Sequence, residues 1–122
     1  MLTGNFYKIL SSEQQDATSF KSLLLINKEH EIFKGHFPGL PVLPGVCMMQ
    51  MIKELLEENR QQPLRLSAVG NIKFLSLLNP SESPQVEAMI KYTVSDDGYY
   101  MAEAILSADN RPFFKMARAA YK

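Results

Sequence analysis

Apolar residues of this chain gather into five runs of strand length and one longer run. The first short run, residues 20–27, ends in polar residues and predicts a mostly buried strand. Four more follow residue 63, and the last three are separated by turn sequences, Asp96-Asp97-Gly98 and Asp109-Asn110-Arg111-Pro112. These three are therefore predicted to form an antiparallel meander. The four later runs are 64–74, 85–94, 99–107 and 113–121.

The longer run, residues 46–59, has the pattern of a helix that is enclosed where it begins and amphipathic where it ends. Its first half is apolar except for Gln50, and its second half sets Leu55 and Leu56 among charged residues. Pro44 stands where a helix can begin, because proline at the first helical position loses no needed N–H. We therefore predict a central helix over residues 44–60.

The order of elements is thus one strand, a loop, one long buried helix and four strands. The loop, residues 30–44, contains prolines and glycines that exclude a regular helix or a central strand. Residues 1–18 are predicted to form a short amphipathic helix, over 2–10, and then a loop. We expect a single α+β domain, residues 1–122, in which an antiparallel sheet wraps one long central helix.

Charge and hydropathy exclude several functions. Thirteen basic residues balance thirteen acidic ones, so no net positive field favours nucleic acid as a partner. The longest nearly uncharged stretch, residues 35–52, contains three prolines and three glycines, which exclude a continuous membrane-spanning helix. The first residues lack the basic start and apolar run of a secretory signal. A cytoplasmic protein without membrane association is expected.

Cysteine and metal chemistry are not expected either. Cys47 is the only cysteine, so there is no internal disulfide or cysteine cluster, and its apolar neighbours indicate a buried thiol. The two histidines do not have the spacing of zinc ligands, and His30 lies between two glutamates, as a surface residue would. We therefore expect no metal and no cofactor.

The candidate chemistry lies between Gly35 and Val46, where His36 sits on a proline-stiffened loop that leads into the helix. Histidine takes or gives a proton near neutral pH. The free N–H groups at a helix start can hydrogen-bond a carbonyl oxygen that gains negative charge. A loop histidine is often satisfied by backbone alone, but this setting favours an active-site role for His36.

His36-Phe37-Pro38-Gly39, followed by Pro41, Pro44-Gly45-Val46 and a long helix, resembles the signature of the bacterial 3-hydroxyacyl-acyl-carrier-protein dehydratases. Asn71-Ile72-Lys73-Phe74 resembles the third strand of that family, and the likeness covers about residues 20–121. It implies a hotdog fold and a homodimer, or a heterodimer with a homologue, whose acyl tunnels lie at the subunit interface. The implied substrate is a thioester of acyl carrier protein or of coenzyme A.

The same resemblance implies roles for single residues. His36 removes the α-proton of the acyl thioester, and the backbone N–H of Gly45 binds the thioester carbonyl. Phe37 and Val46 are the other residues expected at the substrate. The acidic residue of the family, which protonates the departing 3-hydroxyl from the partner subunit's helix, falls on Gln50.

Gln50 puts the dehydration step in question, because a carboxamide cannot supply a proton as a carboxylic acid can. We expect Gln50 to line the acyl tunnel and to orient a substrate hydroxyl or a water; the alternative is a buried amide that only satisfies neighbouring backbone. Glu54 lies one turn further on the same helix face. From there it would reach the site through a water and supply the proton, but its charged neighbours Lys53, Glu57 and Glu58 favour a solvated helix end.

Three functions remain open. The first is a 3-hydroxyacyl thioester dehydratase of fatty acid or related acyl-chain synthesis, with full or weakened activity, and the loop motif favours it. The second is a non-catalytic acyl-binding subunit that partners a complete homologue, which Gln50 favours. The third is a hotdog acyl thioesterase in which Gln50 positions the attacking water. It ranks last, because thioesterases of this fold generally use a helix carboxylate that the first half of this helix lacks.

Overall fold

The computed structural model describes the backbone of residues 2–35 and 42–122, with side chains for 2–33 and 42–122. Along these residues two strands are followed by a four-residue helix, a long helix and four more strands. The elements are β1 (Tyr7–Asp16), β2 (Ser19–Ile26), α1 (Ile32–Gly35), α2 (Gly45–Arg60), β3 (Leu66–Phe74), β4 (Gln85–Val94), β5 (Tyr100–Ala108) and β6 (Arg111–Tyr121).

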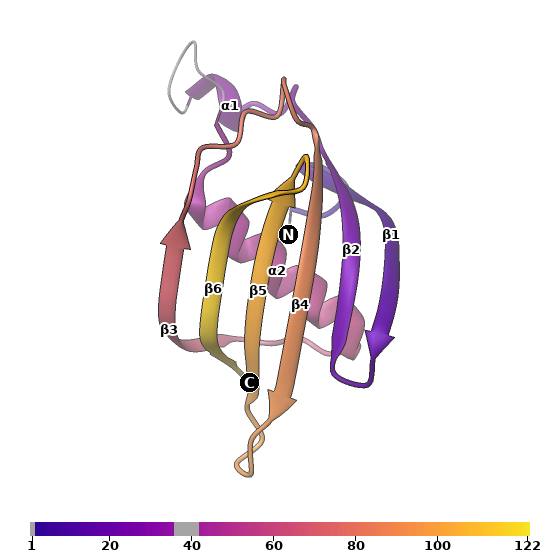
Figure 1. Ribbon diagram of the computed structural model, residues 1–122, viewed down its shortest axis with the longest axis vertical. Helices are drawn as coiled ribbons and strands as arrows, with labels where there is room; N and C mark the ends of the chain where they lie inside the picture. Colours follow the sequence, from indigo (N-terminus) through magenta and orange to yellow (C-terminus); the bar gives the residue numbers. More distant parts are fainter. Residues whose placement is uncertain (1, 36–41) are drawn as a thin grey trace.

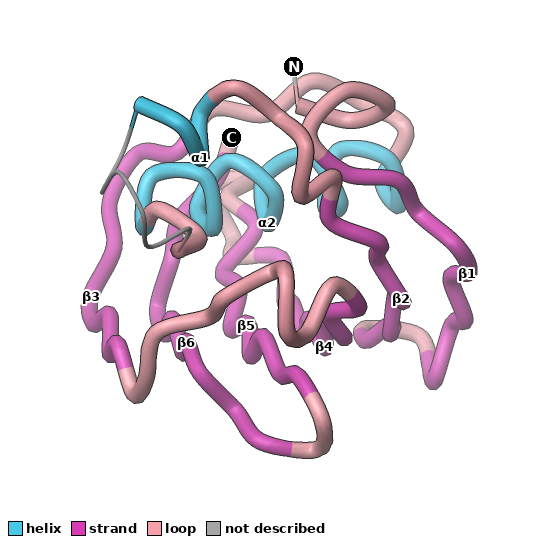
Figure 2. The backbone as a smooth tube through the Cα atoms, turned by 90° about the horizontal axis from the view of Figure 1, so that it is seen from above, coloured by secondary structure: helices cyan, strands magenta, loops and turns pink. Residues whose placement is uncertain are grey.

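The six strands form one sheet in the order β1-β2-β4-β5-β6-β3, and every neighbouring pair is antiparallel. Figure 1 shows α2 lying across one face of this sheet. From above, the sheet curls around α2, with β1 and β3 at its two edges (Figure 2). The expected α+β arrangement, an antiparallel sheet wrapped around one long helix, is confirmed.

The core lies between the concave face of the sheet and α2. Residues of β4 alternate between buried and exposed, so one face of the strand packs inward while the other meets solvent. Met51, Ile52, Leu55 and Leu56 of α2 are all at most 2% exposed. Each such side chain stabilises the fold by roughly 1.5–3 kcal/mol through removal of apolar surface from water. This packing fixes the orientation of α2 and hence of the side chains on its other faces.

The central helix and the meander have nearly the predicted bounds. Helix α2 begins at Gly45, after Pro44 in an extended conformation, and ends at Arg60, before Gln61 in the left-handed region. Positive φ angles of 52° at Asp109 and 62° at Asn110 form the turn between β5 and β6. Such angles suit Asp and Asn, whose side chains tolerate the left-handed region. The predicted turn sequences therefore do connect the strands of the meander.

The prediction for residues 1–18 is wrong in one respect, because residues 7–16 form strand β1 instead of a helix and loop. β1 is an edge strand, and after Tyr7 its residues are mostly exposed, so it carries no apolar alternation of its own. It is held by backbone pairing with β2. Its exposed edge and polar side chains are typical of a sheet end. Tertiary pairing here overrides the local pattern.

No helix in the described part of the chain is long and apolar enough to cross a membrane.

Candidate active site

A pocket of about 300 Å³ opens where α2 begins. Its walls include Gly45 and Met48 of α2, Phe74 at the end of β3 and Leu77 in the loop that follows. These side chains are apolar, so the pocket suits a hydrocarbon chain or a thioester better than a charged ligand. The sequence also predicts the candidate active-site residues at this end of the helix.

Gly45, the first residue of α2, lines this pocket, so backbone donors of the first helical turn lie beside it. The N–H groups of Cys47 and Met48 donate to the Pro44 carbonyl, at 3.1 Å each. No side chain caps the helix, and among the described residues none accepts a hydrogen bond from the N–H of Gly45 or Val46. Within residues 2–35 and 42–122, two donors at the positive end of the helix dipole are thus available to a carbonyl oxygen.

Gly45 allows the aromatic ring of Phe74 to approach the helix start closely. A Cβ atom at position 45 would lie 2.9 Å from Cε1 of Phe74, closer than real Cβ contacts allow. The Phe74 side chain is 62% exposed, so its ring has room to move. Because the ring is part of the pocket wall, such a movement would change the shape of the pocket. Glycine at this position therefore keeps the pocket open beside the free N–H groups.

Apolar side chains around the pocket mouth are unusually exposed. Val46 and Leu77 are each 75% exposed, Phe74 is 62% exposed, and Leu75 is 48% exposed. We call these four residues the apolar rim. Because contiguous exposed apolar surface on a folded domain commonly marks a place of contact with another molecule, the rim is a candidate subunit interface.

The expected site residues divide into those that the structure describes and those that it does not. His36 and Phe37 lie outside the described residues, so their predicted roles stay predictions. Gly45 lines the pocket, and its predicted role in binding the thioester stays a prediction. Val46 belongs to the apolar rim. Gln50 is half-buried on α2, one turn beyond Val46.

The Gln50 side chain has one short hydrogen bond, and its partner is Glu54. Nε2 of Gln50 donates to Oε2 of Glu54 at 2.7 Å. The two residues are four apart on α2, so their side chains lie on the same helix face. The bond to Glu54 therefore influences the orientation of the Gln50 amide group.

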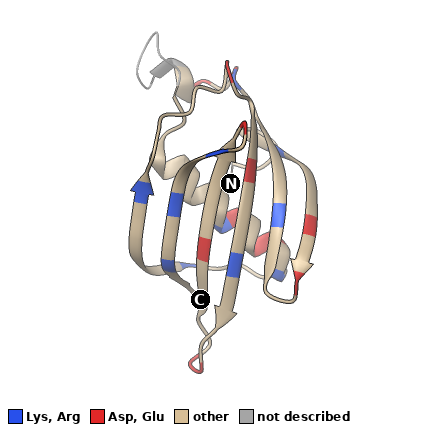
Figure 3. Ribbon diagram, viewed as in Figure 1, with Lys and Arg blue, Asp and Glu red and all other residues tan. Residues whose placement is uncertain are grey.

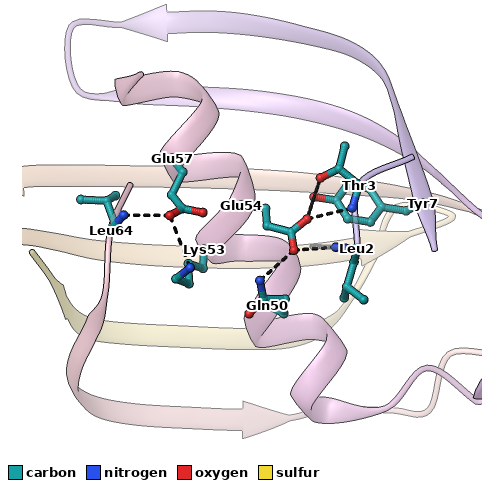
Figure 4. A network of polar contacts seen from close by, with 8 residues as sticks. All are labelled: Leu2, Thr3, Tyr7, Gln50, Lys53, Glu54, Glu57 and Leu64. Atoms are coloured by element: carbon teal, nitrogen blue, oxygen red, sulfur yellow. Dashed lines mark hydrogen bonds and ion pairs between the residues drawn. The ribbon is translucent and has the colours of Figure 1, made fainter. Parts of the chain in front are cut away.

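Glu54 is buried at 4% exposure, which corrects the expectation of a solvated helix end. Its carboxylate accepts four further hydrogen bonds, all from the N-terminal segment (Figure 4). Donors are the backbone N–H of Leu2 at 2.8 Å, the N–H of Thr3 at 2.9 Å, the Thr3 hydroxyl at 2.6 Å and the Tyr7 hydroxyl at 3.1 Å. A buried carboxylate with this many donors is fully satisfied.

These contacts keep Glu54 ionised. Burial alone raises the pKa of a carboxyl group, but the hydrogen bonds from Thr3, Gln50 and Leu2 outweigh it, so the pKa of Glu54 lies below its ordinary value. A carboxylate that holds no proton near neutral pH cannot serve as a general acid there. The lowered pKa therefore disfavours Glu54 as the proton donor.

The lowered pKa of Glu54 predicts a pH-dependent contribution to stability. This contribution is complete above the pKa of an unfolded glutamate, about 4.3, and is lost as the pH falls through the lower pKa of the folded state. Glu54→Gln should lower the unfolding free energy by about 2 kcal/mol or more at pH 7, because hydrogen bonds to a charged group are replaced. Urea unfolding from pH 3 to 7 tests this: the difference between wild type and variant should shrink below about pH 4.3. A constant difference would contradict it.

Other candidate groups near α2 are not available for chemistry. Burial raises the pKa of the Cys47 thiol, which disfavours the nucleophilic thiolate and agrees with the predicted buried cysteine. Glu57 pairs with Lys53 at 3.3 Å and accepts the N–H of Leu64 at 2.8 Å. Within the described residues no group of three metal-ligating side chains occurs. His30 is half-buried, not at the surface as expected, and its Nδ1 accepts the N–H of Ile32.

Known proteins share parts of this sequence. Residues 12–105 match the ApeI-like family, described as ApeI dehydratase. FabZ, the 3-hydroxyacyl-[acyl-carrier-protein] dehydratase, is 33% identical over 67 residues in Clostridium acetobutylicum and 30% identical over 94 residues in Rickettsia bellii. These matches cover 49% and 62% of this chain. The chain spans 48% of the length of the Clostridium protein and 65% of the Rickettsia protein.

Solved structures share the whole arrangement. A chain of the dehydratase heterocomplex ApeI:P from Xenorhabdus doucetiae has a TM-score of 0.71 at 17% identity, covering 93% of this chain and 96% of that one. A mutant thioesterase from Pseudomonas aeruginosa has a TM-score of 0.63 at 18% identity, covering 90% of this chain and 77% of that one. At such identities the likeness establishes the fold alone, and the expected hotdog fold is confirmed. With a family match over more than half of its length, the chain belongs to the ApeI-like family of dehydratases.

Proposed function

We propose that the chain binds a 3-hydroxyacyl thioester in the pocket at the start of α2, and that its own dehydratase activity is weak or absent. The observation that carries this proposal is the combination of an apolar pocket with the N–H of Gly45 beside it, for which the described residues provide no acceptor. Such an N–H can polarise the thioester carbonyl and so acidify the neighbouring α-carbon. Membership of a dehydratase family supports this substrate class.

The proposed reaction needs one base and one acid. His36 takes the α-proton, the electrons of that C–H bond form the α,β double bond, and the C–O bond to the 3-hydroxyl breaks. The departing oxygen leaves as water only if a proton reaches it. Gln50 holds the position from which the family donates this proton, and an amide has no acidic proton to give. We therefore expect substrate to be held without efficient elimination.

A second subunit is part of the proposal. The apolar rim exposes hydrophobic surface beside the pocket, and β3 leaves an unpaired sheet edge at the same side. A dimer that covers both would bring the partner's helix to this pocket. The solved relative from Xenorhabdus is a heterocomplex, which supports pairing with a homologue. A homologue with a carboxylic acid in place of Gln50 would supply the missing proton.

The carrier of the acyl group is proposed to be anionic. Basic residues recur along the strands of the sheet, beside fewer acidic ones (Figure 3), and Lys73 of β3 lies directly opposite Lys115 of β6. Like charges opposite one another are unfavourable unless compensated, and neither lysine has an acidic partner within ion-pairing distance among the described residues. A carrier protein or coenzyme A, both carrying phosphate, would provide compensation.

The substrate proposal is tested with 3-hydroxyacyl thioesters of a carrier protein and of coenzyme A. Binding should be measurable by calorimetry, while the absorbance of the α,β-unsaturated thioester rises slowly or not at all. Release of free thiol, detected with a thiol reagent, would instead identify a thioesterase. Absence of binding to either thioester would overturn the proposal.

The dimer proposal predicts that Leu77→Asp separates the subunits. A charge placed in an apolar interface must be desolvated without a partner, so association should weaken strongly. Sedimentation of wild type at micromolar concentration should show a dimer, and the variant a folded monomer whose melting temperature no longer depends on protein concentration. Leu10→Asp is the matched control, because Leu10 is also exposed, at 46%, but lies on β1 at the other sheet edge. A monomeric wild type would contradict the proposal, unless a homologue added in equal amount forms a heterodimer.

A further inference from the structure

The hydrogen bond to Glu54 determines which end of the Gln50 amide is the nitrogen and which is the oxygen. Oε2 of Glu54 lies 2.7 Å from the end of the Gln50 side chain. An ionised carboxylate only accepts hydrogen bonds, so the Gln50 atom that faces it must be the amide nitrogen. The carbonyl oxygen of the amide then points the other way, as Figure 4 shows. Gln50 therefore presents an acceptor on the side away from Glu54.

Glu54 itself has no freedom to turn. Its Oε1 accepts from the N–H and hydroxyl of Thr3 and from the Tyr7 hydroxyl, while Oε2 accepts from the N–H of Leu2. Tyr7 is fully buried, and α2 is fixed by its packing in the core. Hydrogen bonds of this kind hold the side chain that accepts them in one orientation. The hydrogen bond from Gln50 is therefore made to a carboxylate whose position is fixed.

The oxygen of Gln50 is turned toward an accessible part of the helix. Gln50 is half-buried, and Val46, one turn earlier on the same face, is 75% exposed. Among the described residues, none donates a hydrogen bond to Oε1 of Gln50, while Nε2 is engaged by Glu54. This arrangement leaves an acceptor at the position from which a dehydratase acid would donate.

We propose that Glu54 is a positioning residue, which holds Gln50 as an acceptor for the 3-hydroxyl group of a bound 3-hydroxyacyl thioester. This inference rests on the proposed function and adds the specificity of the site. The substrate hydroxyl donates its proton to Oε1 of Gln50, so the hydrogen bond has the opposite direction to one from an acid. The 3-hydroxyacyl form is thereby favoured over a saturated acyl chain or a 2-enoyl chain, because neither carries that hydroxyl group.

The first test needs no ligand and uses the wild-type chain. The side-chain NH₂ signals of Gln50, assigned by their loss in Gln50→Ala, should show one proton shifted downfield and protected from exchange. Both signals should move when Glu54 titrates at acidic pH. An amide with the shifts and exchange of a free glutamine, unaffected by that titration, would overturn the inference even if Glu54→Gln failed to fold.

The second test compares the affinities for two stable thioether analogues, a 3-hydroxyacyl pantetheine and its 3-deoxy counterpart. Wild type should bind the hydroxyl analogue about fivefold more tightly, as one hydrogen bond allows. In Glu54→Gln the Gln50 amide can turn over, so the preference should fall to about one. Thr3→Val is the matched control: it removes the 2.6 Å bond to Glu54 but leaves the bond to Gln50, and it should keep the preference.

The outcomes separate this inference from the proposed function. Equal affinities in wild type, or an unchanged preference in Glu54→Gln, would overturn the positioning role while leaving acyl binding intact. In Thr3→Val the hydrogen bonds of Glu54 to Leu2, Tyr7 and Gln50 remain. Loss of the preference in this variant as well would show that the effect does not depend specifically on the bond between Glu54 and Gln50, and would overturn the positioning role too. Failure of wild type to bind either analogue would overturn the proposed function and the inference together.

Discussion

Gln50→Glu is expected to raise the dehydration rate by at least about 10²-fold, because a general acid commonly contributes about 10²–10⁴. The substitution changes the shape of the side chain little and places a carboxyl group at the position to which the sequence resemblance assigns the acid of the family. Turnover is followed as the rise in absorbance of the α,β-unsaturated thioester. The gain should appear in the catalytic rate more than in substrate binding, since the new proton acts only when the C–O bond breaks.

Glu54 makes this expectation sharper. The nitrogen that is replaced lies 2.7 Å from Oε2 of Glu54, and two carboxyl groups at such a distance cannot both be ionised. Because four donors from the N-terminal segment keep Glu54 ionised, the shared proton resides mainly on the introduced carboxyl group. Its pKa is thus raised above the ordinary value. The variant should be active below that raised pKa and lose activity as the pH rises through it.

The double variant Gln50→Glu, Glu54→Gln is the matched control for this pH dependence. Without the neighbouring charge, the pKa of the introduced carboxyl group should fall, and the loss of activity should begin at lower pH. Two results would contradict the reading of Gln50. One is full-speed dehydration by the wild type, and the other is a well-folded Gln50→Glu variant that binds substrate and gains nothing.

His36→Ala is expected to abolish the turnover of acyl thioesters, in the wild type and in the more easily measured Gln50→Glu background. Loss of the base that removes the α-proton should cost at least about 10²-fold. The fold should remain intact, because the sequence predicts a chemical role for His36 and a position in a loop. Melting curves and rates measured on the same preparations separate the two effects.

His30→Ala is the control for His36→Ala, since it removes the only other histidine. His30 accepts the N–H of Ile32 and packs edge-to-face on Phe6, with ring centroids 5.3 Å apart. Its replacement should therefore lower stability and leave the rate per folded molecule unchanged. If instead His36→Ala unfolds the protein while the rate per folded molecule stays the same, His36 is structural.

Periodicity predicted the elements whose apolar faces form the core. α2, the meander of β4, β5 and β6, and strand β2 all have bounds close to those expected, because their burial follows from their own sequence. β1 was not predicted, since its polar residues are held by the backbone of β2. The fold class follows from α2 and the correctly predicted strands, and does not depend on β1.

The site was only partly predictable for a related reason. Gly45 and Gln50 are predicted site residues because of their positions in the motif that resembles the dehydratase signature, and Gly45 lines the pocket. Glu54 was taken for a solvated residue, because the donors that bury it, at Leu2, Thr3 and Tyr7, lie about fifty residues earlier in the chain. The one local signal was its spacing of four from Gln50. Contacts of such sequence separation leave no trace in a window of neighbouring residues.

The hydrogen bond between Gln50 and Glu54 also constrains how these positions can evolve. An acid at position 50 beside an acid at position 54 leaves a proton shared between them. The effect of a substitution at one position on activity and stability then depends on the residue at the other. In related sequences we expect positions 50 and 54 to vary together, with a neutral residue at 54 wherever 50 is acidic. The hydroxyl at position 3 should then be dispensable, because no buried carboxylate remains for it to satisfy.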